Sequence, residues 1–192
     1  MDAPSRMTLA TVVAALAWTL ASAGAADTGE YPRTLIAQAR TTIGATMVTS
    51  TVRIRIDRLM EPARRTRVLD GLKYNGYQGF MDALRPLPVI GAIATPNREV
   101  GVRYAWESAV EDRRRLVVVS DKPLFFLPDD TAKPRAGYEL TVVELLFDAR
   151  GAAVGTMAGA ARVKPAPDGI VLSDFAVAPV ELTVAAPPKA KP

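Results

Sequence analysis

The chain has 192 residues, of which 24 are lysine or arginine and 20 are aspartate or glutamate, giving a formal net charge of +4. It contains neither histidine nor cysteine, which excludes disulfides, zinc fingers, histidine-ligated haem and catalysis by serine–histidine or cysteine–histidine pairs. A nucleic-acid-binding protein usually carries a larger and more clustered basic excess, so we expect no nucleic-acid partner. We also expect no metal and no cofactor.

The N-terminus has the three-part pattern of a secretory signal. Arg6 precedes an uncharged apolar run over residues 7–20, and the small residues Ala-Gly-Ala follow at positions 23–25. The apolar run is shorter than the ~20 residues that a membrane-spanning helix needs. We therefore expect residues 1–26 to be a cleaved signal peptide, the protein to be exported (periplasmic or secreted), and no stable membrane insertion after cleavage.

The rest of the chain is long enough for one domain without disulfides, since a domain of this size buries about 70% of its unfolded surface. We expect a single β-rich domain over residues 27–184. Residues 185–192 are rich in proline, alanine and lysine, and such a segment has nothing to bury. They are expected to form a disordered tail.

Residues 27–40 are a mixed lead-in, which suits either a short helical turn or an edge segment. Strand patterns then follow. The clearest is a period of two from Val48 to Asp57, where one face carries Val48, Ser50, Val52, Ile54 and Ile56. About eight strands are expected, over residues 48–57, 89–94, 100–107, 116–120, 138–148, 152–163, 170–177 and 180–184. Short turns and few crossover helices favour a single antiparallel β-barrel or β-sandwich. An outer-membrane barrel is an alternative, but here a charged, proline-rich tail follows the last strand.

One segment, about residues 61–86, breaks the strand pattern. Pro62 suits the first turn of a helix, and four apolar residues farther along share one helical face: Tyr77, Phe80, Met81 and Leu84. Pro86 ends the pattern. We expect a short inserted helical pair, which could cover one open end of a barrel.

Glu144 is the most unusual carboxylate, because it lies in phase with the apolar residues of its predicted strand. A lone buried carboxylate is costly. Glu144 is therefore expected to be paired with an arginine of a neighbouring strand, exposed at an irregular position, or used as a polar anchor in a ligand cavity. Arg53, Arg55 and Arg103 are the candidate partners.

Tyr104 and Trp106 share one face of one predicted strand. Aromatic residues at this spacing usually belong to the core. The alternative is the wall of a cavity for an apolar ligand, as in small barrels. Tyr104, Trp106 and Glu144 are thus the candidate ligand-binding residues, and no catalytic residue is assigned.

The arginines fall into short clusters that have acidic neighbours. In the stretch from Val52 to Arg58, Arg53 and Arg55 share a face with Asp57, which predicts a solvated strand face with cross-strand pairing, for example to Glu139 or Glu144. The run Arg113-Arg114-Arg115 is likewise expected on a solvated face or turn. An anionic lipid or polysaccharide surface is the alternative partner for these clusters.

The order of the sequence pieces resembles a set of exported bacterial proteins of unassigned function. The resemblance rests on "IRIDR", "ALRPLPVIGAIATP", "VRYAWE", "SDKPLFF", "YELTVVELLFD" with a following "RG", and "PVELTV". It covers the chain from about Ile54 to Val184. It implies export and a single β-rich domain, and it carries no known catalytic residue.

Two functions from different classes remain open. The first is a non-enzymatic exported domain that binds a small apolar ligand or an envelope protein. The second is a carboxylate-dependent hydrolase acting on envelope carbohydrate, which requires two carboxylates that converge in a cleft.

Overall fold

The computed structural model of the protein describes residues 30–126 and 135–188. Over these residues the chain forms one helix, α1 (Pro62–Leu84), and ten strands. The strands are β1 (Arg33–Ile43), β2 (Thr46–Ile56), β3 (Gly91–Ala94), β4 (Glu99–Val102), β5 (Tyr104–Val110), β6 (Arg113–Ser120), β7 (Leu140–Phe147), β8 (Ala153–Ala166), β9 (Gly169–Phe175) and β10 (Val180–Val184). The predicted signal peptide and residues 189–192 of the predicted tail lie outside the described residues.

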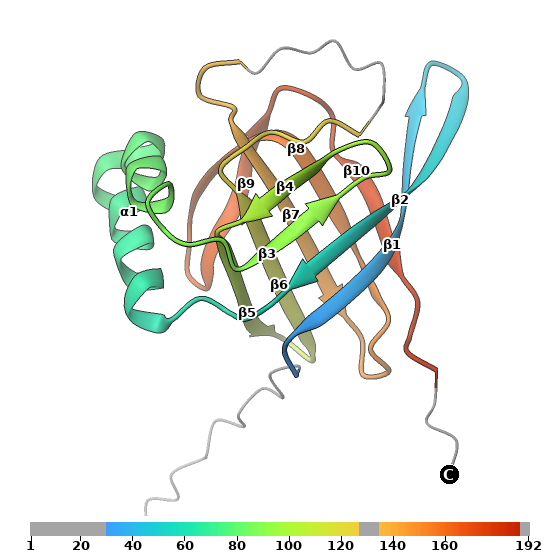
Figure 1. Ribbon diagram of the computed structural model, residues 1–192, viewed down its shortest axis with the longest axis horizontal. Coiled ribbons are helices and arrows are strands. Elements are labelled where there is room, and N and C mark those ends of the chain that lie inside the picture. The colour runs from blue at the N-terminus through green and yellow to red at the C-terminus, as the bar shows by residue number, and fades with distance from the viewer. Residues whose placement is uncertain (1–29, 127–134, 189–192) are drawn as a thin grey trace, which may run out of the picture.

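The ten strands form a single antiparallel sheet that curls almost into a closed barrel (Figure 1). Its order is β4-β3-β2-β1-β10-β8-β7-β6-β5, and β9 pairs with β8 beside this path. The two end strands, β4 and β5, are separated only by Arg103, whose N–H donates to the carbonyl of Val119 over 3.0 Å. The chain itself thus links the two ends of the nearly closed sheet, and the predicted antiparallel β-fold is a barrel rather than a sandwich.

Strand β1 replaces the mixed lead-in that the sequence pattern suggested. It pairs with β2 over its full length, and its buried face carries Leu35, Ala37 and Ala39. Two of these three residues are alanines, so the apolar alternation is weak in the sequence. The hairpin turns at Gly44, whose φ of 59° suits the first central position of a tight type II′ turn.

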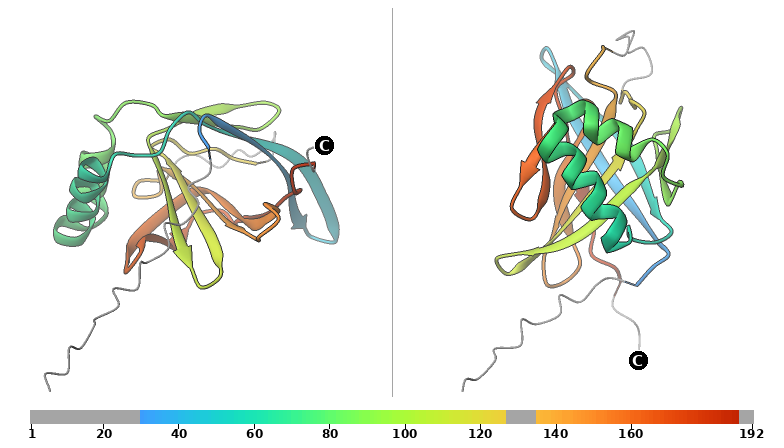
Figure 2. Two further views of the ribbon diagram at one scale, coloured as in Figure 1. Left: turned by 90° about the horizontal axis from the view of Figure 1, so that it is seen from below. Right: turned by 90° about the vertical axis from the view of Figure 1, so that its left-hand side faces the viewer.

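Helix α1 is kinked at Gly76, which has φ 65° and ψ −154°. The kink confirms the predicted helical pair. A side chain on Gly71 or Gly79 would collide with the backbone of the other residue, so these two glycines let the two helical pieces pack closely. The helical pair lies against the outer wall of the barrel and not over an open end (Figure 2).

The placement of α1 gives the protein two apolar layers. Along β7, alternate residues point into the barrel or out toward α1, and both sets are buried, for example Val143 and Leu145 on one face and Leu140 and Val142 on the other. The buried side of α1 supplies Val68, Leu72, Phe80, Met81 and Leu84. This second layer explains why the sequence of β7 is apolar on both faces.

Candidate functional site

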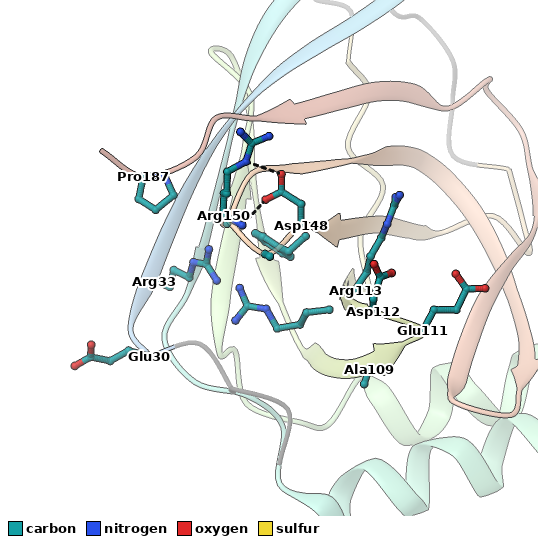
Figure 3. A pocket seen from close by; sticks show the side chains of 13 residues that line it. Glu30, Arg33, Ala109, Glu111, Asp112, Arg113, Asp148, Arg150 and Pro187 are labelled. Atoms are coloured by element: carbon teal, nitrogen blue, oxygen red, sulfur yellow. Dashed lines mark hydrogen bonds and ion pairs between the residues drawn. The ribbon is translucent and has the colours of Figure 1, made fainter. Parts of the chain in front are cut away.

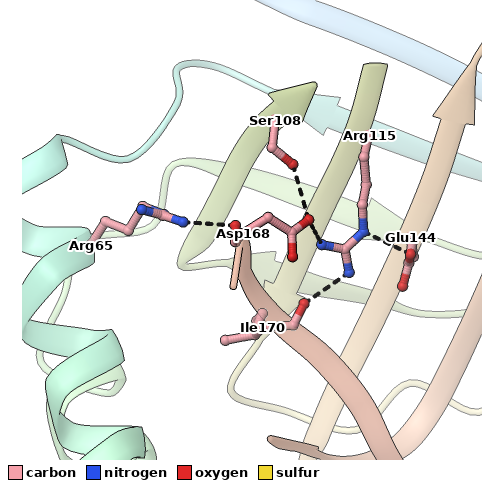
Figure 4. A network of polar contacts seen from close by, with 6 residues as sticks. All are labelled: Arg65, Ser108, Arg115, Glu144, Asp168 and Ile170. Carbon is pink, nitrogen blue, oxygen red and sulfur yellow. Dashed lines mark hydrogen bonds and ion pairs between the residues drawn. The ribbon is translucent and has the colours of Figure 1, made fainter. Parts of the chain in front are cut away.

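A polar network occupies the outer wall of the barrel near the start of α1 (Figure 4). Its centre is Arg115 on β6, which is 5% exposed. The guanidinium donates from Nε to Glu144 on β7 and from Nη1 to Asp168, each over 2.7 Å, and from Nη2 to the carbonyl of Ile170 over 2.8 Å. Three strands and the turn before β9 are therefore tied to one buried arginine.

The network pairs one arginine with two carboxylates. Burial lowers the pKa of Arg115, but its hydrogen bonds and ion pairs with Glu144 and Asp168 outweigh burial and raise that pKa above its ordinary value. The two carboxylates are about one third exposed, so water reaches their outer oxygens. Such an arrangement fixes the positions of β6, β7 and the turn before β9 relative to one another.

Tyr104 and Trp106 lie beside this network and face α1. The guanidinium of Arg65, on α1, stacks 4.3 Å from the ring centre of Trp106 and donates to the carbonyl of Asp168 over 2.8 Å. Tyr104 is 1% exposed, and burial raises the pKa of its hydroxyl. The aromatic pair thus joins the helix to the barrel wall.

The structure brings Tyr104, Trp106 and Glu144, the three site residues predicted from the sequence, to the same region. They lie on the outer wall of the barrel and not in its interior. The predicted pairing of Glu144 with an arginine of a neighbouring strand is confirmed, but the partner is Arg115 and none of the three arginines proposed from the sequence. Of those, Arg55 pairs with Asp57 and Arg103 with Asp121. The two cavities described below are lined by other residues, so a ligand contact for Tyr104, Trp106 and Glu144 stays a prediction.

One end of the barrel is charged (Figure 3). There the guanidiniums of Arg33 and Arg114 both lie over the ring of Phe147, at 4.7 and 4.6 Å from its centre. Just inside, the Tyr31 hydroxyl donates to the buried carboxylate of Glu107 over 2.8 Å. Burial, and then the nearby charge of Arg114, lower the pKa of Arg33.

An open basin of about 710 Å³ covers this end. Both acidic and basic side chains line it, and Arg150 pairs with Asp148 over 3.8 Å at the turn between β7 and β8. The turn between β5 and β6 places Glu111 at a φ of 55°, which is unusual for a residue other than glycine. The lining residues include four acidic and four basic side chains, so their formal charges cancel.

The opposite end of the barrel holds an apolar cavity of about 160 Å³. Its walls come from the last residues of β1, the segment after β6, the middle of β8 and the start of β10. The lining residues are Thr41, Thr42, Ile43, Leu124, Phe125, Phe126, Met157, Gly159, Val177, Ala178 and Val180. We call this space the mouth cavity.

The mouth cavity exists because residues 124–126 cross the end of the barrel. The N–H of Leu124 donates to the carbonyl of Gly159 over 2.9 Å, and a side chain on Gly159 would collide with the backbone of Leu124. The hydroxyl of Thr141 fixes the start of this segment by donating to the carbonyl of Lys122 over 2.8 Å. The sequence pattern did not lead to a prediction of this site. The signal was nevertheless visible, because the apolar residues of "PLFFLP" lie beside a loop and outside any predicted strand.

No family model, curated protein or solved structure matches the chain. Within the described ranges, α1 is not long and apolar enough to cross a membrane. The same residues contain no group of three or more acidic side chains placed to hold a metal ion.

Proposed function

We propose that this protein is an exported, non-enzymatic domain that binds a small apolar group in the mouth cavity. The group is either a whole small molecule or the hydrocarbon end of a larger one. The observation that carries the proposal is the apolar lining at one end of a barrel whose other end is charged. The secretory pattern of residues 1–26 supports export.

The size of the mouth cavity limits the ligand. At about 160 Å³ it is close to the ~150 Å³ apolar cavity that binds benzene in an engineered protein. It is smaller than the ~300–1,000 Å³ sites of drug-sized ligands. The cavity therefore suits about six carbons, with any polar headgroup left outside.

The rim of the cavity is also apolar. Ile43, which lines it, is 46% exposed, and Met47 on the other strand of the same hairpin is 60% exposed. Thr41 and Thr42 are the polar lining residues from β1. Such a rim receives a hydrocarbon group without first desolvating charged side chains.

Calorimetric titration with butanoate, hexanoate, octanoate and decanoate tests this function. Affinity is expected to rise with chain length, since each buried CH₂ contributes about 0.8 kcal/mol, and to level off once the cavity is filled. Absence of binding by any of the four carboxylates, or affinity that rises without levelling, would contradict the proposal.

A filling variant localises the binding. Thr41 follows Ala37 and Ala39 on the inward face of β1, so Thr41→Phe directs an aromatic ring into the mouth cavity. Gln38→Phe places the same ring on the exposed face of the same strand and is the matched control. We expect Thr41→Phe to weaken octanoate binding at least tenfold and Gln38→Phe to leave it unchanged; equal effects would place the binding elsewhere.

A further inference from the structure

The β1–β2 hairpin projects from the barrel (Figure 1) and leaves one edge of β2 without a neighbour among the described residues. On one side β2 pairs with β1 along its whole length. On the other side β3 pairs only with the last part of β2, from Arg53 to Ile56. The edge from Thr46 to Val52, "TMVTSTV", is therefore open; we call it the free edge.

The direction of the backbone groups at the free edge follows from the next residues along the chain. The N–H of Asp57 donates to the carbonyl of Ile90, on the β3 side, over 2.9 Å. Backbone groups alternate sides along an antiparallel strand, and the β1–β2 register is unbroken. Met47, Thr49 and Thr51 therefore direct their N–H and C=O groups outward, while the residues between them bond to β1.

The free edge also lacks the features that normally prevent strand addition. Natural proteins protect open edges with charged residues, prolines or bulges. The chain has no charged residue and no proline from Thr41 to Val52, and Met47 is 60% exposed. An uncharged, threonine-rich, seven-residue edge is suited to pairing with another strand.

We propose that the free edge pairs with the free edge of a second copy of this chain. A two-fold axis at Thr49 would place Thr46 opposite Val52 of the other copy and Met47 opposite Thr51. This register uses the whole edge, because the hairpin turn at Gly44 limits one end and the pairing of Arg53 with Ala94 limits the other.

The pairing is self-complementary in three respects. Three outward-facing residues on each copy give about six inter-chain hydrogen bonds, two for each hydrogen-bonded pair. No like charges meet across the axis, since the edge carries none. The exposed side chain of Met47 packs on Thr51 of the other copy, and the two sheets become continuous.

A crosslinking experiment tests the pairing in the full chain. The protein has no cysteine, so Thr49→Cys introduces the sole thiol. The Cα atoms of a hydrogen-bonded pair are ~5.5 Å apart, within the ~4.4–6.8 Å range of disulfides. Mild oxidation should give a covalent dimer of Thr49→Cys. Gln38→Cys, an exposed position inside the sheet, should stay monomeric under the same conditions.

Sedimentation of uncrosslinked protein gives the second measurement. Thr49→Pro removes an outward N–H and leaves the β1–β2 ladder intact, whereas Thr49→Val keeps that N–H. We expect wild type and Thr49→Val to form dimers as concentration rises from micromolar to millimolar, and Thr49→Pro to remain monomeric with an unchanged circular dichroism spectrum.

Three results would overturn the proposal. The first is a wild type that stays monomeric to millimolar concentration. The second is a Thr49→Pro variant that is folded and still dimeric. The third is a monomeric wild type that cosediments with phospholipid vesicles, together with a Met47→Ser variant that does not cosediment. That result would assign the projecting hairpin to a lipid surface instead.

Discussion

Replacing Arg115 by methionine tests the role assigned to the polar network on the outer wall. The change removes three hydrogen bonds, two of them to carboxylates at 2.7 Å. Breaking a fully buried pair costs about 3–5 kcal/mol, but Glu144 and Asp168 are about one third exposed and regain water. We therefore expect a loss of about 2–3 kcal/mol in the free energy of unfolding.

Urea unfolding at pH 7, followed by circular dichroism, measures this loss. A loss of that size corresponds to a fall in melting temperature of about 5–10 °C for a chain of this length. Arg113→Met changes an exposed arginine of the same strand and should stay within about 0.5 kcal/mol of wild type. A loss below about 1 kcal/mol for Arg115→Met would refute the structural role of the network.

Removing a leftover carboxylate should partly rescue this variant. In the background Arg115→Met, Glu144→Leu replaces an unpaired carboxylate in an apolar strand by an apolar side chain. We expect the double variant to be more stable than Arg115→Met alone, because a buried ion pair can be replaced by packed apolar residues at little cost. Additive losses would show that the two residues do not act as a pair.

Three further predictions concern a hydrogen bond of α1, the turn between β5 and β6, and the mouth cavity. The Tyr77 hydroxyl donates to Glu139 over 2.6 Å, and burial together with this hydrogen bond raises the pKa of Tyr77. The folded pKa of Tyr77 lies above its unfolded value of about 10. The stability that the protonated Tyr77 hydroxyl contributes is therefore complete below pH 10 and is lost as pH rises further. Tyr77→Phe should cost about 1–2 kcal/mol at pH 7, and urea unfolding should show the gap from wild type narrowing at pH 11; a constant gap would contradict this. Glu111→Gly should raise the free energy of unfolding by about 0.5–1 kcal/mol by relieving the positive φ, and a lower melting temperature would argue against the strain. Gly159→Ala should displace residues 124–126 and weaken octanoate binding at least tenfold, a result that calorimetry checks and that unchanged affinity would exclude.

The antiparallel sheet and its helical pair were predictable because their signals are local. The period of two from Val48 to Asp57 and the turns between later strands predict an antiparallel sheet, and the helical spacing after Pro62 predicts the insertion. Strand β1 was missed because alanine gives a weak apolar signal. The choice between barrel and sandwich depends on the curl of the whole sheet, which brings its end strands β4 and β5 to either side of Arg103, and no local pattern reveals that curl.

The candidate site was less predictable because it depends on register. The ion pair of Glu144 was expected, but its partner lies in a run of three arginines that the sequence placed on a solvated face. Arg115 is buried beneath the turn before β9, where it contacts Asp168 and the carbonyl of Ile170. The mouth cavity likewise depends on residues 124–126 crossing the barrel end, a contact between segments far apart in the chain.

Methionine-methyl NMR of the protein titrated with octanoate tests the central claim most directly. Met157 lines the mouth cavity and is 1% exposed, whereas Met60 and Met81 are buried elsewhere in the core. The proposed function predicts a saturable shift of the Met157 methyl signal while the Met60 and Met81 signals stay in place. An unchanged Met157 signal, or equal shifts of all three, would contradict binding of an apolar group in the mouth cavity.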